Sequence, residues 1–150
     1  MTVEYEPVER EAVLPCSPER LWEALTDPEA VSAWFGARVE WEVTPGGDIH
    51  TCDAEGNERC GVVHGVAPGR RLRFRWWPVD DGRQTTEVTY VIEPVELGAR
   101  LIVTERRVTC ARAYSTAAAP RTAEAWSQWS DWDNRLLLLW TAARRVVAVR

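Results

Sequence analysis

The middle of the chain alternates apolar and polar residues with a period of two. In the stretch 71–77 (RLRFRWW), Leu72, Phe74 and Trp76 fall on one face and arginines occupy most of the other. Short turn sequences such as PGG, DAEGNE, APG and ELG separate this segment from similar ones. The pattern predicts antiparallel strands joined by hairpins, in a sheet with one buried and one polar face. With a further strand over 2–14, we expect about six or seven strands.

Two short helices are predicted directly after the first strand. Ser17 can cap the first helix, and Pro18 stands at its first position, where the missing N–H of proline costs nothing. The pair Asp27–Pro28 repeats this signal, with Thr26 as an alternative cap. Gly36 is placed to end the second helix in a left-handed conformation.

From Thr122 onward the apolar period changes to 3.6 residues, which predicts a C-terminal helix of more than about 20 residues and about 30 Å. Its opposite face carries mostly polar residues such as Arg135. Because this helix alone is long enough to cover the sheet, we expect an α+β fold, with a curved antiparallel sheet around the helix in a single domain over 1–150. The apolar face comprises Trp129, Trp132, Leu136, Leu139, Trp140 and Ala143.

The composition excludes some classes of protein. The chain of 150 residues carries 23 acidic and 18 basic residues, all arginines, for a net charge of −5. This balance argues against a general nucleic-acid binder, which needs a basic surface, and we interpret Arg70, Arg71, Arg73 and Arg75 as a solvated sheet face. No apolar run approaches the length of a membrane span. The acidic N-terminus does not resemble a secretion signal, and four cysteines without a CxxC spacing suit a reduced, cytoplasmic protein.

Several stretches together resemble the START/Bet v 1-like (SRPBCC) superfamily. Their residue motifs are most similar to its bacterial "activator of Hsp90 ATPase homologue-like" branch. The resemblance implies a helix-grip fold with a hydrophobic cavity between the sheet and the long helix. It does not imply one activity, because the superfamily includes lipid and hormone carriers, polyketide aromatase/cyclases and co-chaperone domains. Nothing before the first helix corresponds to an Hsp90-binding N-terminal domain, so activation of Hsp90 is not expected. The matching stretches are SPERLWEALTDPEAVSAWFG (17–36), PGGDI (45–49), GVVHGVAPGRRLRFRWWP (61–78), VTYVIEPVELGARLIVTERR (88–107) and the tryptophan-rich last helix.

The large apolar residues that point toward this cavity are the candidate ligand-binding residues. Rigid aromatic rings line concave apolar sites, and tryptophan adds one N–H donor. The alternative is that the same rings only fill the core. The candidates are the apolar and aromatic residues Trp34, Phe35, Phe74, Trp76, Tyr90, Trp129, Trp132, Leu136 and Trp140, together with the polar residue Glu105.

Among the polar residues, Glu105 is the strongest candidate for a functional role. It continues the face of Leu101 and Val103, so simple alternation points its carboxylate inward, where it could act as an acid, a base or a ligand anchor. In the alternative interpretation, which we favour at this point, the strand frays or bulges at Thr104 and Glu105 pairs with an arginine such as Arg107.

A metal site is not expected. His50, Cys52, Cys60 and His64 lie on two strands of one hairpin, but His64 is about 13 Å along the strand from Cys60, so the four cannot converge without a bulge. A Cys52–Cys60 disulfide is an unfavoured alternative in a reducing cell. We find no nucleophile, nucleotide-binding or cofactor motif, and no cofactor is expected.

Three functions remain open. The preferred one is binding of a small hydrophobic or amphipathic molecule of unknown identity. The second is an aromatase/cyclase-like enzyme that acts on a polyketide-like substrate, with Glu105 moving protons. The third is a protein-interaction or co-chaperone-like module, monomeric or homodimeric, whose cavity is filled.

Overall fold

The structure is a computed structural model that describes residues 7–108 and 132–148, with side chains as far as Thr141. Seven strands and three α-helices occupy these ranges, together with one short 3-10 helix, η1 (Gly82–Gln84). The strands are β1 (Val8–Leu14), β2 (Ala37–Trp41), β3 (Asp48–Asp53), β4 (Glu58–Ala67), β5 (Arg71–Pro78), β6 (Thr86–Val95) and β7 (Gly98–Arg107). The helices are α1 (Pro18–Thr26), α2 (Pro28–Phe35) and α4 (Trp132–Ala148).

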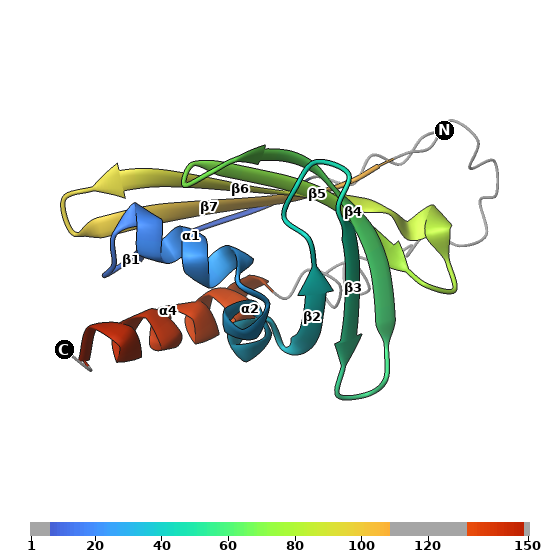
Figure 1. The fold of residues 1–150 in the computed structure, drawn as a ribbon, viewed down its shortest axis with the longest axis horizontal. Helices are drawn as coiled ribbons and strands as arrows, with labels where there is room; N and C mark the ends of the chain where they lie inside the picture. Colours follow the sequence, from blue (N-terminus) through green and yellow to red (C-terminus); the bar gives the residue numbers. More distant parts are fainter. Residues whose placement is uncertain (1–6, 109–131, 149–150) are drawn as a thin grey trace.

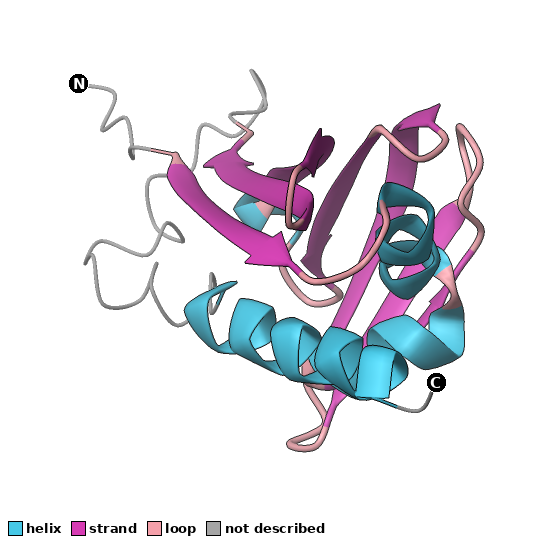
Figure 2. Cartoon of the chain, turned by 90° about the vertical axis from the view of Figure 1, so that its left-hand side faces the viewer, coloured by secondary structure: helices cyan, strands magenta, loops and turns pink. Residues whose placement is uncertain are grey.

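All seven strands form one antiparallel sheet in the order β1-β7-β6-β5-β4-β3-β2. β1 therefore pairs with the last strand, and α1 and α2 carry the chain to the opposite edge, where β2 begins. The sheet curls around the helices on its concave side, with α4 beneath β6 and β7 and α2 beside the N-terminal end of α4 (Figures 1 and 2). This is the helix-grip α+β architecture that the sequence predicts.

The predicted caps hold the two short helices in place. The side chain of Ser17 accepts a hydrogen bond of 3.2 Å from the N–H of Arg20, and Asp27 accepts one of 3.2 Å from Ala30. Gly36 ends α2 with a φ of 79°, in the left-handed region that favours glycine. Trp34, on the last turn of α2, donates its indole N–H to the carbonyl of Ala24 and so fixes α2 against α1.

The inner face of α4 follows the predicted stripe, with one correction. Trp132, Leu136 and Leu139 are buried, but Trp140 is 36% exposed. Trp140 lies about 80° around the helix from Trp132, so the expectation that it faces the sheet was wrong. Trp129 and the expected first turns of the helix lie outside the described residues.

One register shift disturbs the sheet. Val63 pairs with Phe74 and Gly65 with Arg73, so His64 is the extra residue of a bulge in β4 and its side chain is exposed. Across the described ranges, no helix is long and apolar enough to cross a membrane.

Candidate functional site

Glu105 lies in a regular part of β7. It pairs with Val8 of β1 on one side and with Val88 of β6 on the other, and the ladder continues to Arg107 without a bulge. Its side chain is fully buried. The favoured expectation of a frayed strand was therefore wrong, because pairing on both sides keeps the alternation intact.

Three neutral donors bind the Glu105 carboxylate. Trp132 of α4 donates its indole N–H to Oε1 at 2.9 Å. Trp76 of β5 donates its indole N–H to Oε2 at 3.0 Å, and the Thr86 hydroxyl donates to the same oxygen at 2.6 Å. Each of these bonds joins β7 to another element, so the arrangement ties α4, β5 and β6 to β7.

Aromatic rings enclose this carboxylate. Phe35 contacts Trp76 at 5.4 Å and Trp132 at 6.0 Å between ring centroids, and Tyr90 contacts Trp132 at 5.7 Å. Phe74 joins Trp76 to Tyr90 at 5.9 and 5.6 Å. Most of these pairs are edge-to-face, the arrangement that ring quadrupoles favour. The rings form one continuous cluster between sheet and helix.

The cluster leaves almost no free space. The void enclosed by Val31, Phe35, Phe74, Trp76 and Tyr90, among others, holds about 10 Å³, roughly one water molecule. Tyr90 is fully buried, and burial raises the pKa of its hydroxyl far above the usual 10, against the opposing charge of Arg135. This part of the interior is therefore packed core.

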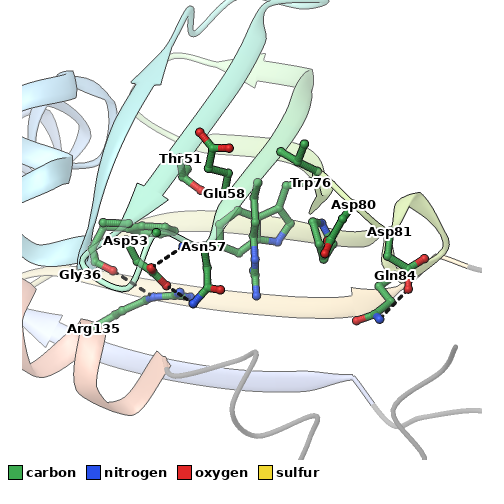
Figure 3. Close-up of a pocket in the computed structure, with 16 residues that line it drawn as sticks. Gly36, Thr51, Asp53, Asn57, Glu58, Trp76, Asp80, Asp81, Gln84 and Arg135 are labelled. Atoms are coloured by element: carbon green, nitrogen blue, oxygen red, sulfur yellow. Dashed lines mark hydrogen bonds between the residues drawn. The ribbon is translucent and has the colours of Figure 1, made fainter.

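A much larger pocket of about 730 Å³ opens beside the cluster, where the ends of β3, β4 and β5 face the first turn of α4 (Figure 3). Phe35 and Trp76 form its apolar floor and belong to the cluster as well. The rest of the described lining is mostly polar: Gly36, Ala37, Thr51, Asp53, Gly56, Asn57, Glu58, Arg59, Pro78, Val79, Asp80, Asp81, Gln84 and Arg135.

Two arginines of this pocket stack on the aromatic floor. The Arg59 guanidinium of β4 lies 4.2 Å from the centroid of the Trp76 ring. The Arg135 guanidinium of α4 lies 4.3 Å from that of Phe35 and 4.9 Å from that of Trp132, and its Nε–H donates to the Phe35 carbonyl at 3.3 Å. Cation–π contacts of this kind are favourable when partly desolvated.

The sequence analysis missed both arginines as site residues. Arg135 was placed on the solvent face of the last helix, although it precedes the buried Leu136. Strand alternation could have indicated the inward position of Arg59. Gly61 and Val63 on the same strand are buried, so residue 59 points inward as well.

Two acidic residues at the rim of the pocket form hydrogen bonds within their own loops. Asp53 accepts hydrogen bonds from Asn57 and from the Glu55 N–H, which lower the pKa of its carboxyl in spite of the opposing effect of burial. Asp81 accepts bonds from Gln84 and Arg83, with the same result for its pKa. These acids therefore stay ionised and shape the loops around the pocket.

The matching family model is "Activator of Hsp90 ATPase homolog 1-like protein", and it covers residues 15–132. The chain belongs to this family. A comparison with curated proteins found no match.

Solved structures share the fold of this family member. A protein from Mesorhizobium loti, MLL2253, aligns with a TM-score of 0.78 at 20% identity, over 93% of this chain and 98% of that one. A protein from Rhodobacter sphaeroides aligns with a TM-score of 0.68 at 25% identity, over 96% and 94%. DynU16, described as a protein of the dynemicin biosynthetic locus, aligns with a TM-score of 0.73 at 23% identity, over 90% of this chain and 46% of that one.

The histidines and cysteines of the β3–β4 hairpin do not converge in this family member. His50 pairs directly with Cys60, but Cys52 pairs with Glu58, and the His64 side chain is exposed. The described part of the chain contains no group of three or more His, Cys, Asp or Glu side chains that could hold a metal ion. Cys52 and Cys60 are free thiols.

Proposed function

We propose that this protein binds a small amphipathic molecule in the pocket beside the aromatic cluster. The observation that supports the proposal is the pocket itself, about 730 Å³ in volume, with the rings of Phe35 and Trp76 as its floor and charged side chains at its rim. Ligand sites combine an apolar surface with a few placed polar groups in this way. The apolar part of the ligand would lie against the rings, and its polar end would face the rim.

The position of the pocket revises the expected binding site. Phe35 and Trp76 line the pocket beneath the two arginines, although both are largely buried, whereas Phe74, Tyr90, Trp132 and Leu136 support them from within the core. Because rigid support keeps a binding surface in shape, these buried residues contribute to affinity through the geometry of the floor.

The arrangement around Glu105 favours binding over catalysis. A general acid or base must reach the proton that it moves. Here the carboxylate is fully buried, and within the described part of the chain it accepts hydrogen bonds from the neutral donors Trp76, Thr86 and Trp132. A cyclase-like activity would draw support from the fold shared with DynU16, but likeness at 23% identity is a likeness of fold alone.

The protein-interaction alternative makes a different prediction. Leu137 and Leu138 on the outer side of α4 are 61% and 39% exposed. In that alternative, the pocket takes no small molecule, and substitution of these leucines changes association instead.

A pocket-blocking substitution tests the proposal with a matched control. Val79 lines the pocket and Val13 lies on β1 away from it, and both side chains are exposed, 52% and 42%. Isothermal titration calorimetry with octanoate and with octanol measures binding to the wild-type protein, Val79→Trp and Val13→Trp. We expect at least one probe to bind the wild type and Val79→Trp to weaken that binding about tenfold or more, equivalent to about 1.4 kcal/mol. Val13→Trp should bind like the wild type. Equal binding by all three proteins, or binding of neither probe, would contradict the proposal.

A further inference from the structure

We infer that the ligand of this pocket is a monoanionic amphipathic acid, whose carboxylate binds between Arg59 of β4 and Arg135 of α4. The inference rests on the proposed function and adds to it the chemical class of the ligand. It follows from where the two guanidinium groups lie, from the charges around them and from the rim of the pocket.

The two guanidinium groups come from different elements, β4 and α4, and both lie near the ring of Trp76. Arg59 lies 4.2 Å and Arg135 lies 5.5 Å from the centroid of the Trp76 ring. Both residues line the pocket, and their side chains are partly buried. Stacking on rings fixes the plane of each guanidinium, so little side-chain freedom is lost when its N–H groups bind a ligand. The planar fork of arginine matches the two oxygens of a carboxylate.

The charges of the floor favour an added anion. Behind the rings lies Glu105, whose charge acts on Arg59 together with that of Asp53. Burial lowers the pKa of Arg59 to about 10, and the nearby Arg135 acts in the same direction, against Glu105 and Asp53. The carboxylate of a ligand bound at this position would offset part of the desolvation and of the mutual repulsion of the two arginines.

The rim sets an upper limit to the ligand's charge. Asp53, Glu58, Asp80 and Asp81 line the pocket around the arginines. Asp53 and Asp81 form hydrogen bonds within their own loops, as described above. Oε1 of Glu58 lies 3.3 Å from Nε2 of His50. These carboxylates would repel a dianionic phosphate more strongly than a singly charged carboxylate. The apolar tail then lies along Trp76, Pro78 and Val79, which line the same pocket.

Three probes with one tail and different polar ends test the inference. Isothermal titration calorimetry compares octanoate, octanol and octyl phosphate on the full chain. The variants are Arg59→Gln and Arg135→Gln, with Arg59→Lys and Arg135→Lys as charge-retaining versions. Arg100→Gln is the matched control, because Arg100 lies on β7 outside the pocket and makes an exposed ion pair of 3.5 Å with Glu93. Thermal melting of each variant identifies any that fails to fold. If a glutamine variant does not fold, the lysine variant at the same position is used in its place.

We expect octanoate to bind the wild type more tightly than either other probe. Each glutamine variant should weaken octanoate about tenfold or more and leave octanol unchanged, and each lysine variant should give a smaller loss. Arg100→Gln should match the wild type. Octanol that binds as tightly as octanoate, or octanoate binding that ignores Arg59 and Arg135, would overturn the inference while the proposed pocket stands. Tighter binding of octyl phosphate would overturn the monoanionic class, and binding of none of the probes would overturn both proposals.

Discussion

The indole N–H of Trp132 donates a 2.9 Å hydrogen bond to the buried carboxylate of Glu105. The bond joins the first turn of α4, as the structure describes it, to the inner face of β7. A second indole, that of Trp76, reaches the other oxygen of the same carboxylate. At least part of the tryptophan content of this chain therefore holds a buried polar side chain inside an aromatic core, beside the pocket that we propose as the ligand site.

Replacement of Glu105 by glutamine should destabilise the protein. Among the described residues, the carboxylate accepts from Trp76, Thr86 and Trp132, but an amide turns a donor nitrogen toward at least one of them, which leaves a buried donor without its acceptor. We expect Glu105→Gln to lower the free energy of unfolding by about 1–3 kcal/mol. Glu93→Gln on the neighbouring strand is the control, because the Glu93 side chain is about half exposed (47%). Urea unfolding curves measure both, and equal stability of the two variants would show that the Glu105 contacts do not stabilise the fold.

A methyl group at Gly61 should displace Trp76. A Cβ at Gly61 would lie 2.3 Å from the backbone oxygen of Arg75 and 3.0 Å from the Cβ of Trp76, so the strand would have to shift. Gly65 on the same strand is the control, since the nearest atoms to its added Cβ are 3.9 Å away.

For Gly61→Ala we expect a loss of about 2 kcal/mol or more in the free energy of unfolding, and for Gly65→Ala a much smaller change. The same urea unfolding measurement compares them. Because Trp76 is also the pocket floor, Gly61→Ala should weaken octanoate binding as well. A Gly61→Ala protein with wild-type stability would be incompatible with the close approach of β4 and β5.

Glu87 should give the protein a specific sensitivity to acid. Its buried carboxylate lies 3.0 Å from Nε of Arg75 and 2.9 Å from a terminal nitrogen of Arg106. Burial acts to raise the pKa of Glu87, but the two arginines outweigh it and hold the pKa below its usual 4.5. A carboxyl with a depressed folded-state pKa stabilises the protein above its unfolded pKa, and this stability is lost as the pH falls through the folded value.

The melting temperature of the wild type should therefore fall as the pH drops below about 4.5. Glu87→Gln should be less stable than the wild type at neutral pH and should lose less on acidification. Thermal melts followed by circular dichroism between neutral and acidic pH provide the comparison. Parallel curves for the two proteins would rule out Glu87 as a source of the acid sensitivity.

Local signals predicted most of the fold. The capped prolines at Pro18 and Pro28 locate α1 and α2, because capping and a fixed proline φ act within a few residues. Alternation placed Leu72, Phe74 and Trp76 of β5 on the buried face. The family resemblance supplied the helix-grip architecture, but the pairing of β1 with β7 was not predicted, because no local pattern encodes it.

The details of the site were less predictable, since they depend on contacts between distant residues. Glu105 was interpreted as part of a frayed strand, because a buried carboxylate is costly unless donors surround it, and its donors come from β5, β6 and α4. Arg135 was placed in solvent for a similar reason: its stacking partners, Phe35 and Trp76, lie on other elements. The core is packed and the open pocket lies beside it. This arrangement depends on how side-chain volumes fill the space between sheet and helix, which the hydrophobic pattern does not reveal.

The most direct test of the proposed ligand class is native mass spectrometry of the freshly purified protein, with Val79→Trp measured in parallel. The pocket predicts that the wild type carries an additional mass that is lost on denaturation, that solvent extraction identifies it as an amphipathic carboxylic acid, and that Val79→Trp carries less of it. Extraction of a neutral or cationic molecule would contradict the inference that the ligand is an acid. A wild-type protein of bare mass that also fails to take up added octanoate would contradict the ligand site itself.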